Sequence, residues 1–212
     1  MLKRLFDIFA SGIGLLLISP PMFLVAVAVK FTSAGPVFFR QERIGRGGRP
    51  FFILKFRSMV ADAPKKGGQI TCGDDPRITP IGKWLRKSKI DELPQLFNVL
   101  KGDMSIVGPR PEVRRYVEMF QEDYDVILQV RPGITDLASI KYHDEAAILG
   151  QAANPEEEYV RCVLPEKIRL AKEYVARRSF WLDLTVIFGT LGRLAHDRLS
   201  QLWNRNKMKE SL

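Results

Sequence analysis

The most constraining feature of this sequence is an uncharged stretch of 22 residues near its N-terminus. Residues 8–29 hold no Asp, Glu, Lys or Arg, and a straight helix of that length can cross a bilayer. Ser19, Pro20 and Pro21 interrupt its middle, and proline removes a backbone donor and clashes with the preceding turn. We therefore expect a break there, with apolar arms of ~18 Å and ~12 Å against a hydrocarbon core of about 30 Å. Neither arm would cross the membrane alone.

Positive charges flank this stretch on both sides. Lys3 and Arg4 precede it, and five cations lie between residues 30 and 49. Because Lys and Arg mark cytoplasmic flanks, we expect residues 1–35 to form a re-entrant hairpin that enters and leaves the same face. The Ser19 hydroxyl is a candidate partner for backbone groups freed at the break. Two alternatives remain open, namely a cleaved signal peptide and a buried helix of a globular domain.

The chain as a whole is basic and has the composition of one folded domain. Its 212 residues include 33 basic and 24 acidic ones, give a net charge of +9, and are 46% hydrophobic. This charge suits either an anionic membrane surface or nucleic acid. With the apolar N-terminal stretch, it favours the membrane. We expect a cytoplasmic domain over residues 36–203 and a polar tail over residues 204–212.

Local patterns predict an α+β fold that is mostly helical. Aromatic and β-branched residues predict a β-hairpin from residues 37–40 and 51–56, joined by a glycine-rich turn without the Walker spacing. Proline, glycine and apolar periodicity predict helices beginning at Thr79 and over residues 95–100, 112–130, 155–158 and 165–178. Residues 180–203 predict an amphipathic helix with Trp181 and Trp203 near its ends. It would lie flat on the membrane or pack on the domain.

Two adjacent carboxylates, Asp91 and Glu92, stand inside a cationic surround. Lys83, Arg86, Lys87 and Lys89 precede the pair, and Arg110, Arg114 and Arg115 follow it. A carboxylate can attack a pyrophosphate only where cations or a divalent metal cancel the repulsion between them. Adjacent side chains diverge, so we expect the two acids to have different roles. The pair would lie just before a helix N-terminus, which favours bound phosphate; alternatively, Asp91 is a helix cap and Glu92 a surface charge.

Three motifs between Asp91 and Pro111 resemble one protein family. They are Asp91-Glu-Leu-Pro94, Asn98-Val-Leu-Lys-Gly-Asp-Met-Ser105 and Val107-Gly-Pro-Arg-Pro111. Together they resemble the bacterial sugar transferases, the monotopic phosphoglycosyl transferases that start glycan assembly on a polyprenol phosphate carrier. The resemblance extends through residues 3–7, 41–45, 55–59, 131–135 and 179–183, and leaves out only about the last 15 residues.

The resemblance implies a two-step transfer. Asp91 would attack the β-phosphate of a UDP-sugar and release UMP, and polyprenol phosphate, such as undecaprenyl phosphate, would then take the phosphosugar. Mg²⁺ would be held by Asp91 and Glu92, unless Glu92 instead accepts a proton from the acceptor. We expect phosphate contacts from five cations, of which Lys55 and Arg57 could instead face lipid headgroups or solvent: Lys55, Arg57, Arg86, Arg110 and Arg131. Arg110 stands between two prolines that fix its backbone.

The implied partners are a UDP-sugar donor, the polyprenol phosphate acceptor and a phospholipid membrane, with no nucleic acid and a possible homodimer. The expected location is the bacterial inner membrane, with the catalytic domain on the cytoplasmic face, in exopolysaccharide, O-antigen or glycoprotein synthesis. We expect this chain to be the minimal catalytic form. The sugar is not identified, and we expect residues 65–75 and 142–153 to select it. A basic membrane scaffold without activity and a nucleic-acid-binding protein are the alternatives.

Overall fold

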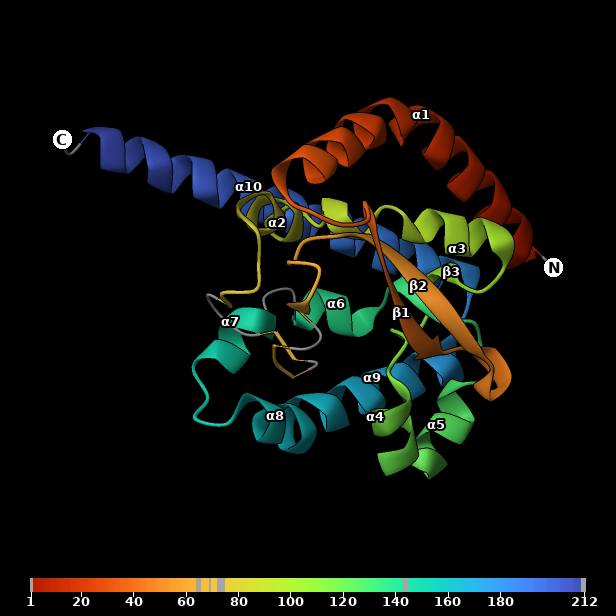
Figure 1. Ribbon diagram of the computed structural model, residues 1–212. Coiled ribbons are helices and arrows are strands. Elements are labelled where there is room, and N and C mark those ends of the chain that lie inside the picture. Colours follow the sequence, from red (N-terminus) through yellow and green to blue (C-terminus); the bar gives the residue numbers. More distant parts are fainter. Residues whose placement is uncertain (1, 64–65, 69, 72–74, 143–144, 211–212) are drawn as a thin grey trace.

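The first helix forms an arch over the rest of the molecule (Figure 1). The computed structural model describes residues 2–63, 66–68, 70–71, 75–142 and 145–210, and for residues 197–210 the backbone alone. Most of the described residues are in helices, and the strands form two small two-stranded sheets. The predicted α+β, mostly helical class is therefore confirmed. Three helices lie beneath the arch: α2 (Pro80–Lys87), α3 (Gln95–Lys101) and α10 (Phe180–Glu210) (Figure 1). Four others lie farthest from it: α4 (Arg114–Met119), α5 (Gln121–Ile127), α8 (Pro155–Glu158) and α9 (Leu164–Arg177) (Figure 1).

Helix α1 (Leu2–Thr32) continues through both prolines, so the expected break into two separate helices is wrong. The helix bends strongly instead (Figure 1), as prolines within a helix cause. Pro20 cannot donate to the carbonyl of Leu16, four residues earlier. The Ser19 hydroxyl donates to that carbonyl oxygen at 2.9 Å, and so gives it a partner at the bend.

The inner face of α1 packs on the domain, and polar contacts fix its N-terminal arm. Met22 and Val29 are buried against Phe56 and Leu85. The Asp7 carboxylate, 2% exposed, accepts from the Ser105 hydroxyl and the Ile106 N–H, both at 3.0 Å. Lys3 forms a 2.6 Å ion pair with buried Asp183 of α10. The start of α1 is therefore tied to the domain by buried polar groups, which are costly to separate.

The predicted hairpin is present. Strands β1 (Phe38–Ile44) and β2 (Pro50–Phe56) pair antiparallel, with Phe38 opposite Phe56 and Ile44 opposite Pro50. In the connecting turn Gly47 and Gly48 have φ of 68° and 74°, where glycine has no steric penalty. The Asn98 side chain accepts from the Leu54 N–H at 3.0 Å and donates to the Phe52 oxygen at 2.8 Å. This amide attaches α3 to β2.

The expected helices around the carboxylate pair are also present. Helix α2 (Pro80–Lys87) is capped by the Thr79 side chain, which accepts from the Gly82 N–H. A 3-10 turn (Ile90–Glu92) follows, and α3 (Gln95–Lys101) ends at Gly102 with φ 103°. Among the described residues, Lys89 is the only one other than glycine that has a positive φ, 57°. Such strain persists where the surroundings enforce it, and here it stands two residues before Asp91.

A parallel pair of short strands positions a second loop. Strands β3 (Ser105–Val107) and β4 (Gly133–Thr135) pair in parallel. A Cβ added at Gly133 would collide with the backbone of Gly108, so this crossing requires glycine. The carboxyl ends of parallel strands lie at one edge of a sheet. The segments that follow, containing Arg110 and Asp136, are therefore brought together.

The remaining helices complete the core away from α1. The stretch expected as one helix over residues 112–130 is two helices, because the backbone at Phe120 (φ −128°, ψ 45°) is not helical: α4 (Arg114–Met119) and α5 (Gln121–Ile127). The other helices are α6 (Leu137–Lys141), α7 (Glu145–Gly150), α8 (Pro155–Glu158) and α9 (Leu164–Arg177), with a π-helical segment, Tyr159–Val163, before α9.

Helix α10 (Phe180–Glu210) is longer than expected. It contacts α6 and both strands of the parallel pair, and its C-terminal part extends beyond the rest of the molecule (Figure 1). The backbone remains helical to Glu210, so the tail predicted for residues 204–212 begins inside a helix. The predicted interfacial tryptophan Trp203 lies outside the described side chains, whereas Trp181 is exposed.

Candidate active site

Glu92 forms ion pairs with two cations, Lys55 and Arg110. It comes from the 3-10 turn after α2, and its carboxylate accepts from Lys55 of β2 at 2.7 Å and from both terminal nitrogens of Arg110. Burial favours a higher pKa for Glu92, but Arg110 and Lys55 outweigh it and hold the pKa well below its usual range. Glu92 is therefore ionised at neutral pH and joins the two cations.

Asp91 has a different environment, as the divergence of adjacent side chains predicts. It is 6% exposed, and its Oδ1 atom is buried without a hydrogen-bond partner in the described part of the chain. Burial, with a contribution from Glu92, raises the pKa of Asp91, although Lys55, Arg86 and Lys89 oppose the rise. A buried oxygen without a partner is rare in proteins. Together with the raised pKa, it makes Asp91 a candidate for a functional group.

The Pro-Arg-Pro loop after β3 presents Arg110 to this pair. The backbone N–H of Arg110 donates to Asp136 Oδ2 at 3.2 Å, while Asp136 Oδ1 accepts from the Ser139 N–H and hydroxyl. On the other side of the loop, Arg43 donates to the Pro111 carbonyl at 3.2 Å. Both contacts fix the loop backbone, so the guanidinium is held in place before any ligand binds.

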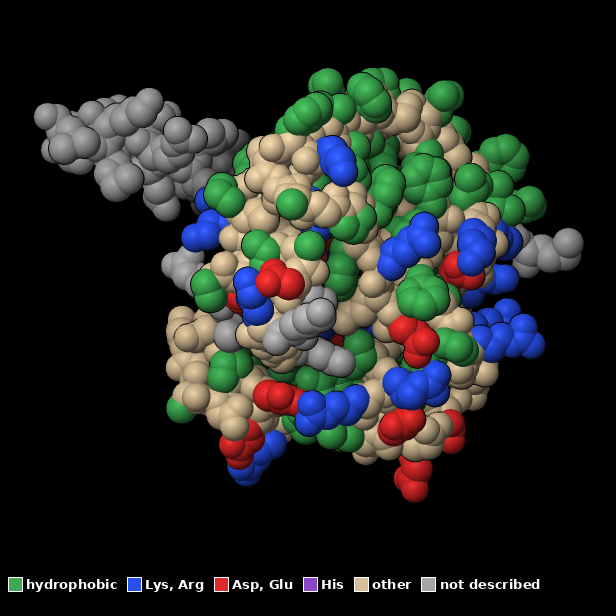
Figure 2. All heavy atoms as spheres, viewed as in Figure 1, with side chains coloured by type: hydrophobic (Ala, Val, Ile, Leu, Met, Phe, Trp, Pro, Cys, Tyr) green, Lys and Arg blue, Asp and Glu red, His purple; other side chains and the backbone are tan. Residues whose placement is uncertain are grey.

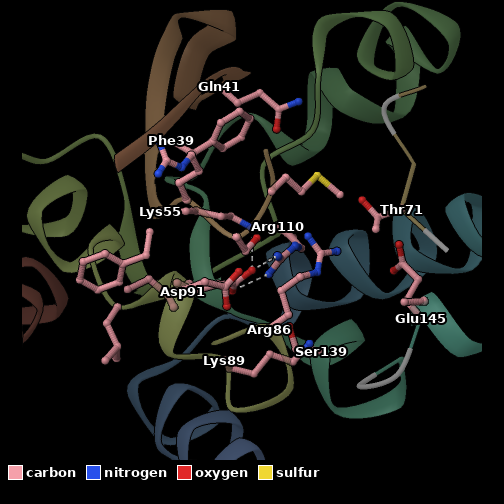
Figure 3. A pocket seen from close by; sticks show the side chains of 18 of the residues that line it. Phe39, Gln41, Lys55, Thr71, Arg86, Lys89, Asp91, Arg110, Ser139 and Glu145 are labelled. Atoms are coloured by element: carbon pink, nitrogen blue, oxygen red, sulfur yellow. Dashed lines mark hydrogen bonds and ion pairs between the residues drawn. The ribbon is translucent and has the colours of Figure 1, made fainter. Parts of the chain in front are cut away.

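These residues line a large open cleft. Its volume is about 2270 Å³, well above the ~300–1,000 Å³ of ordinary small-molecule pockets. Lys55, Arg86 and Arg110 point toward Asp91 in one part of the cleft, and Glu145 lies on the other side (Figure 3). The cleft is large enough for an elongated donor and part of a second substrate. Its cationic part suits phosphate groups.

Two of the five predicted phosphate contacts have other partners. Arg57 follows β2 and is 4% exposed; it donates to the Ser33 carbonyl at 2.7 Å and to the Val29 carbonyl at 3.4 Å. It caps the C-terminal end of α1. Arg131 donates to the Gly102 carbonyl at 2.8 Å and does not line the cleft. Each guanidinium thus satisfies backbone carbonyls at the end of a helix, and a phosphate contact from either residue stays a prediction.

The metal role expected for the pair fits one residue better than the other. Asp91 Oδ1 is a carboxylate oxygen with no partner in the part of the chain that the structure describes. Mg²⁺ prefers ligands of this kind, and it commonly takes one or two protein carboxylates together with substrate phosphates. Both Glu92 oxygens face cations at hydrogen-bonding distance. No cluster of three acidic, His or Cys side chains suited to a metal occurs among the described residues.

Two residues that act through others, Asp136 and Asn98, were not predicted from the sequence. Asp136 is 6% exposed and positions Arg110; its place immediately before α6 was a local signal only for a helix cap, which it also is. Asn98 attaches α3 to β2, and nothing in its local sequence predicts this. The expected helix N-terminus after the pair exists, but α3 has seven residues and we assign it no anion-binding role.

Comparisons with known proteins agree on one family. The profile described as bacterial sugar transferase matches residues 1–197. UDP-N-acetylgalactosamine-undecaprenyl-phosphate N-acetylgalactosaminephosphotransferase of Aeromonas hydrophila is 42% identical over 193 residues, which are 90% of this chain and 43% of that protein. UDP-glucose:undecaprenyl-phosphate glucose-1-phosphate transferase of Escherichia coli K12 is 40% identical over 195 residues, 90% of this chain and 39% of that protein.

A shorter relative is matched over most of its length. Exopolysaccharide production protein ExoY of Rhizobium meliloti is 33% identical over 210 residues, which are 90% of this chain and 84% of that protein. The chain thus spans about two fifths of the two longer relatives and most of this one. Both the profile and this relative cover the carboxylate pair and the Pro-Arg-Pro loop. The chain therefore belongs to the bacterial sugar transferase family.

Proposed function

We propose that this protein is a phosphoglycosyl transferase that moves a phosphosugar from a UDP-sugar to undecaprenyl phosphate or a similar polyprenol phosphate. The observation that supports this most is Asp91 Oδ1, a buried oxygen without a partner among the described residues, within a part of the cleft lined by Lys55, Arg86 and Arg110. The names of the relatives from Aeromonas hydrophila and Escherichia coli give the same donor and acceptor classes. The reaction would start exopolysaccharide or related glycan synthesis.

The first chemical step is an attack by Asp91 on the β-phosphorus of the donor. A new bond forms between the Asp91 carboxylate oxygen and that phosphorus, and the bond to the bridging oxygen breaks. UMP leaves with the bridging oxygen, and an aspartyl phosphosugar remains. Burial raises the pKa of Asp91, and a carboxylate removed from water is a stronger nucleophile than a solvated one.

The second step transfers the phosphosugar to the lipid. A phosphate oxygen of the polyprenol phosphate attacks the same phosphorus, the bond to Asp91 breaks, and the carboxylate is restored. A phosphate monoester has a second pKa near 6, so at neutral pH it attacks largely as the dianion and needs no protein base. Glu92, with a pKa held well below its usual range, would be a poor base, and we assign it the positioning of Lys55 and Arg110.

The cations neutralise the charge that otherwise repels Asp91. Arg110 and Lys55 would contact the β-phosphate, and Arg86 the leaving phosphate, with the planar guanidinium offering paired donors. Mg²⁺ bound through one Asp91 oxygen and the substrate phosphates would neutralise the pyrophosphate further. All these groups lower the energy of a transition state with charge on several phosphate oxygens.

The membrane would hold the protein by α1 and by helices lying at the interface. Hydrophobic side chains cover the arch in Figure 2, and its exposed residues include Leu16, Phe23 and Phe31. α1 is long and apolar enough to cross a membrane by length and composition, but its bend and its fixed N-terminal arm favour a re-entrant arrangement in one leaflet. Exposed Trp84 of α2 and Trp181 of α10 suit the interface. The cleft would then lie at the cytoplasmic face of the bacterial inner membrane.

Nucleotide release tests this proposal. Purified full-length protein with Mg²⁺, undecaprenyl phosphate and a panel of UDP-sugars should release UMP from at least one donor, and Asp91→Asn should abolish the release. Asp123→Asn is a matched control on the surface, where Asp123 pairs with Lys172 at 2.7 Å, and it should retain full activity. Release of UDP would mean transfer of the sugar alone and would contradict the role of Asp91.

A further inference from the structure

The part of the cleft away from Asp91 differs in charge. Around Asp91 and Glu92 the lining includes four cations: Lys55, Arg86, Lys89 and Arg110. Elsewhere the lining includes two acids and two bases that contact one another: Glu112, Glu145, Arg43 and Lys167. The first part is suited to phosphate, whereas the charges of the four residues named for the second part cancel one another. A ligand portion that occupies the second part should be polar and uncharged.

A buried network makes the second part rigid. The Tyr159 hydroxyl donates to Glu112 at 2.6 Å, and Arg43 contacts the same carboxylate at 3.2 Å. Burial favours a higher pKa for Glu112, but Lys167 and Arg43 outweigh it and lower the pKa. Lys167 Nζ lies 3.3 Å from the Tyr159 hydroxyl and 3.8 Å from Glu112. Tyr159 and Glu112 therefore hold the ammonium group of Lys167 in place from its buried side.

Glu145 stands at the surface of this network. Its Oε2 atom accepts from Lys167 at 2.9 Å, and its side chain is 32% exposed. In the described part of the chain Oε1 makes no hydrogen bond, and Figure 3 shows the side chain on the opposite side of the cleft from Asp91. One oxygen of an ionised carboxylate is thus held in place while the other can accept a hydrogen bond from a ligand.

The uncharged parts of a UDP-sugar, which are the uracil, the ribose and the sugar, differ in the donors that they offer to this acceptor. Uracil presents two carbonyl oxygens and one N–H at its rim, so a carboxylate would repel most of it. The ribose offers two hydroxyl donors, and a hexose offers several. We propose that Glu145, supported by Lys167, accepts a hydrogen bond from a hydroxyl or amide N–H of the donor sugar and so helps to select it. This inference rests on the proposed function, and Glu145 lies within residues 142–153, one of the two stretches expected to select the sugar.

The test is Glu145→Gln in the full-length protein. The amide oxygen would turn to Lys167 and leave an NH₂ group where the carboxylate oxygen accepted. We expect kcat/KM for the preferred UDP-sugar to fall about tenfold, the loss of one hydrogen bond to a charged group. The other donors of the panel are chosen from UDP-glucose, UDP-galactose and their N-acetylated counterparts. The ratio of kcat/KM for the preferred donor to kcat/KM for these other donors should decrease. Inhibition by UMP, which contains no sugar to be transferred, should remain within twofold.

Glu166→Gln is the matched control, because Glu166 pairs with Lys141 and Arg169 on the surface and does not line the cleft. It should leave both donor preference and UMP inhibition unchanged. Unaltered preference in folded Glu145→Gln, checked by thermal unfolding, would overturn the inference while UMP release by the wild type still supported the proposed function. Weaker UMP inhibition would assign this part of the cleft to uridine, and no UMP release by the wild type would overturn both.

Discussion

Replacing Glu92 with Gln should destabilise the protein. The Glu92 side chain is 15% exposed and joins Lys55 and Arg110, whose side chains are 20% and 33% exposed. Removing one partner of a fully buried ion pair costs about 3–5 kcal/mol, and solvent near these two cations reduces the expected loss to about 2–3 kcal/mol. At about 2–4 °C per kcal/mol for a domain of this size, the midpoint of thermal unfolding should fall by about 4–12 °C at pH 7.

The effect should depend on pH with a defined sign. The pKa of Glu92 in the folded protein lies well below the ordinary value of 4.5. Its charge therefore stabilises the fold fully above pH 4.5, and this contribution is lost as pH falls through the folded pKa. The difference in unfolding midpoint between wild type and Glu92→Gln should be constant near neutrality and should narrow below pH 4.5.

A nucleotide should partly compensate for the lost carboxylate. Without Glu92 the cations Lys55 and Arg110 repel each other, and a bound pyrophosphate would replace the missing anion. UDP should therefore raise the unfolding midpoint more in Glu92→Gln than in the wild type. Glu173→Gln, which removes surface pairs with Arg169 and Arg177, is the control and should shift the midpoint by about 2 °C or less. Equal midpoints and equal UDP responses in wild type and Glu92→Gln would refute the reasoning.

Three further predictions concern Asp91, the crossing of β3 and β4, and the bend of α1. Asp91→Asn should lower kcat by about 1,000-fold or more yet raise the unfolding midpoint at pH 7. The pKa of Asp91 is raised by burial, so the ionised carboxylate destabilises the fold above that pKa. The higher unfolding midpoint of Asp91→Asn should therefore disappear below pH 3.8, the ordinary pKa of Asp. Gly133→Ala should cost about 3 kcal/mol or more in thermal unfolding, because its Cβ would collide with the Gly108 backbone; an unchanged midpoint would contradict this. Replacing Pro20 and Pro21 with Ala should straighten α1 and carry an N-terminal tag to the periplasm, detected by an impermeant label; a cytoplasmic tag with full activity would contradict the re-entrant arrangement.

Local chemistry was predictable from the sequence where one residue determines the backbone. The proline that follows Thr79 predicted the start of α2, and the glycine at position 102 predicted the end of α3. The apolar periodicity over residues 112–130 was real, since Val113, Val117 and Ile127 are buried. It did not reveal the non-helical backbone at Phe120, because two short helices can keep one apolar stripe.

The candidate site was predictable as a set of charges but not as a set of pairs. The divergence of Asp91 and Glu92 follows from backbone geometry, and Arg110 was expected from its prolines. That Glu92 holds Lys55, 37 residues away in the chain, depends on tertiary packing. The same limit explains Arg57 and Arg131. Their charges resembled those of the site, yet each is used by carbonyls at the end of a helix.

The most direct test of the central claim is the mass of the protein after incubation with its UDP-sugar donor and Mg²⁺ in the absence of a polyprenol phosphate. We predict an added mass equal to one phosphosugar, located on the peptide containing Asp91, and its loss when undecaprenyl phosphate is supplied. Asp91→Asn should show no added mass. An adduct on another residue, or UMP release with unmodified protein throughout rapid-quench sampling, would contradict the account.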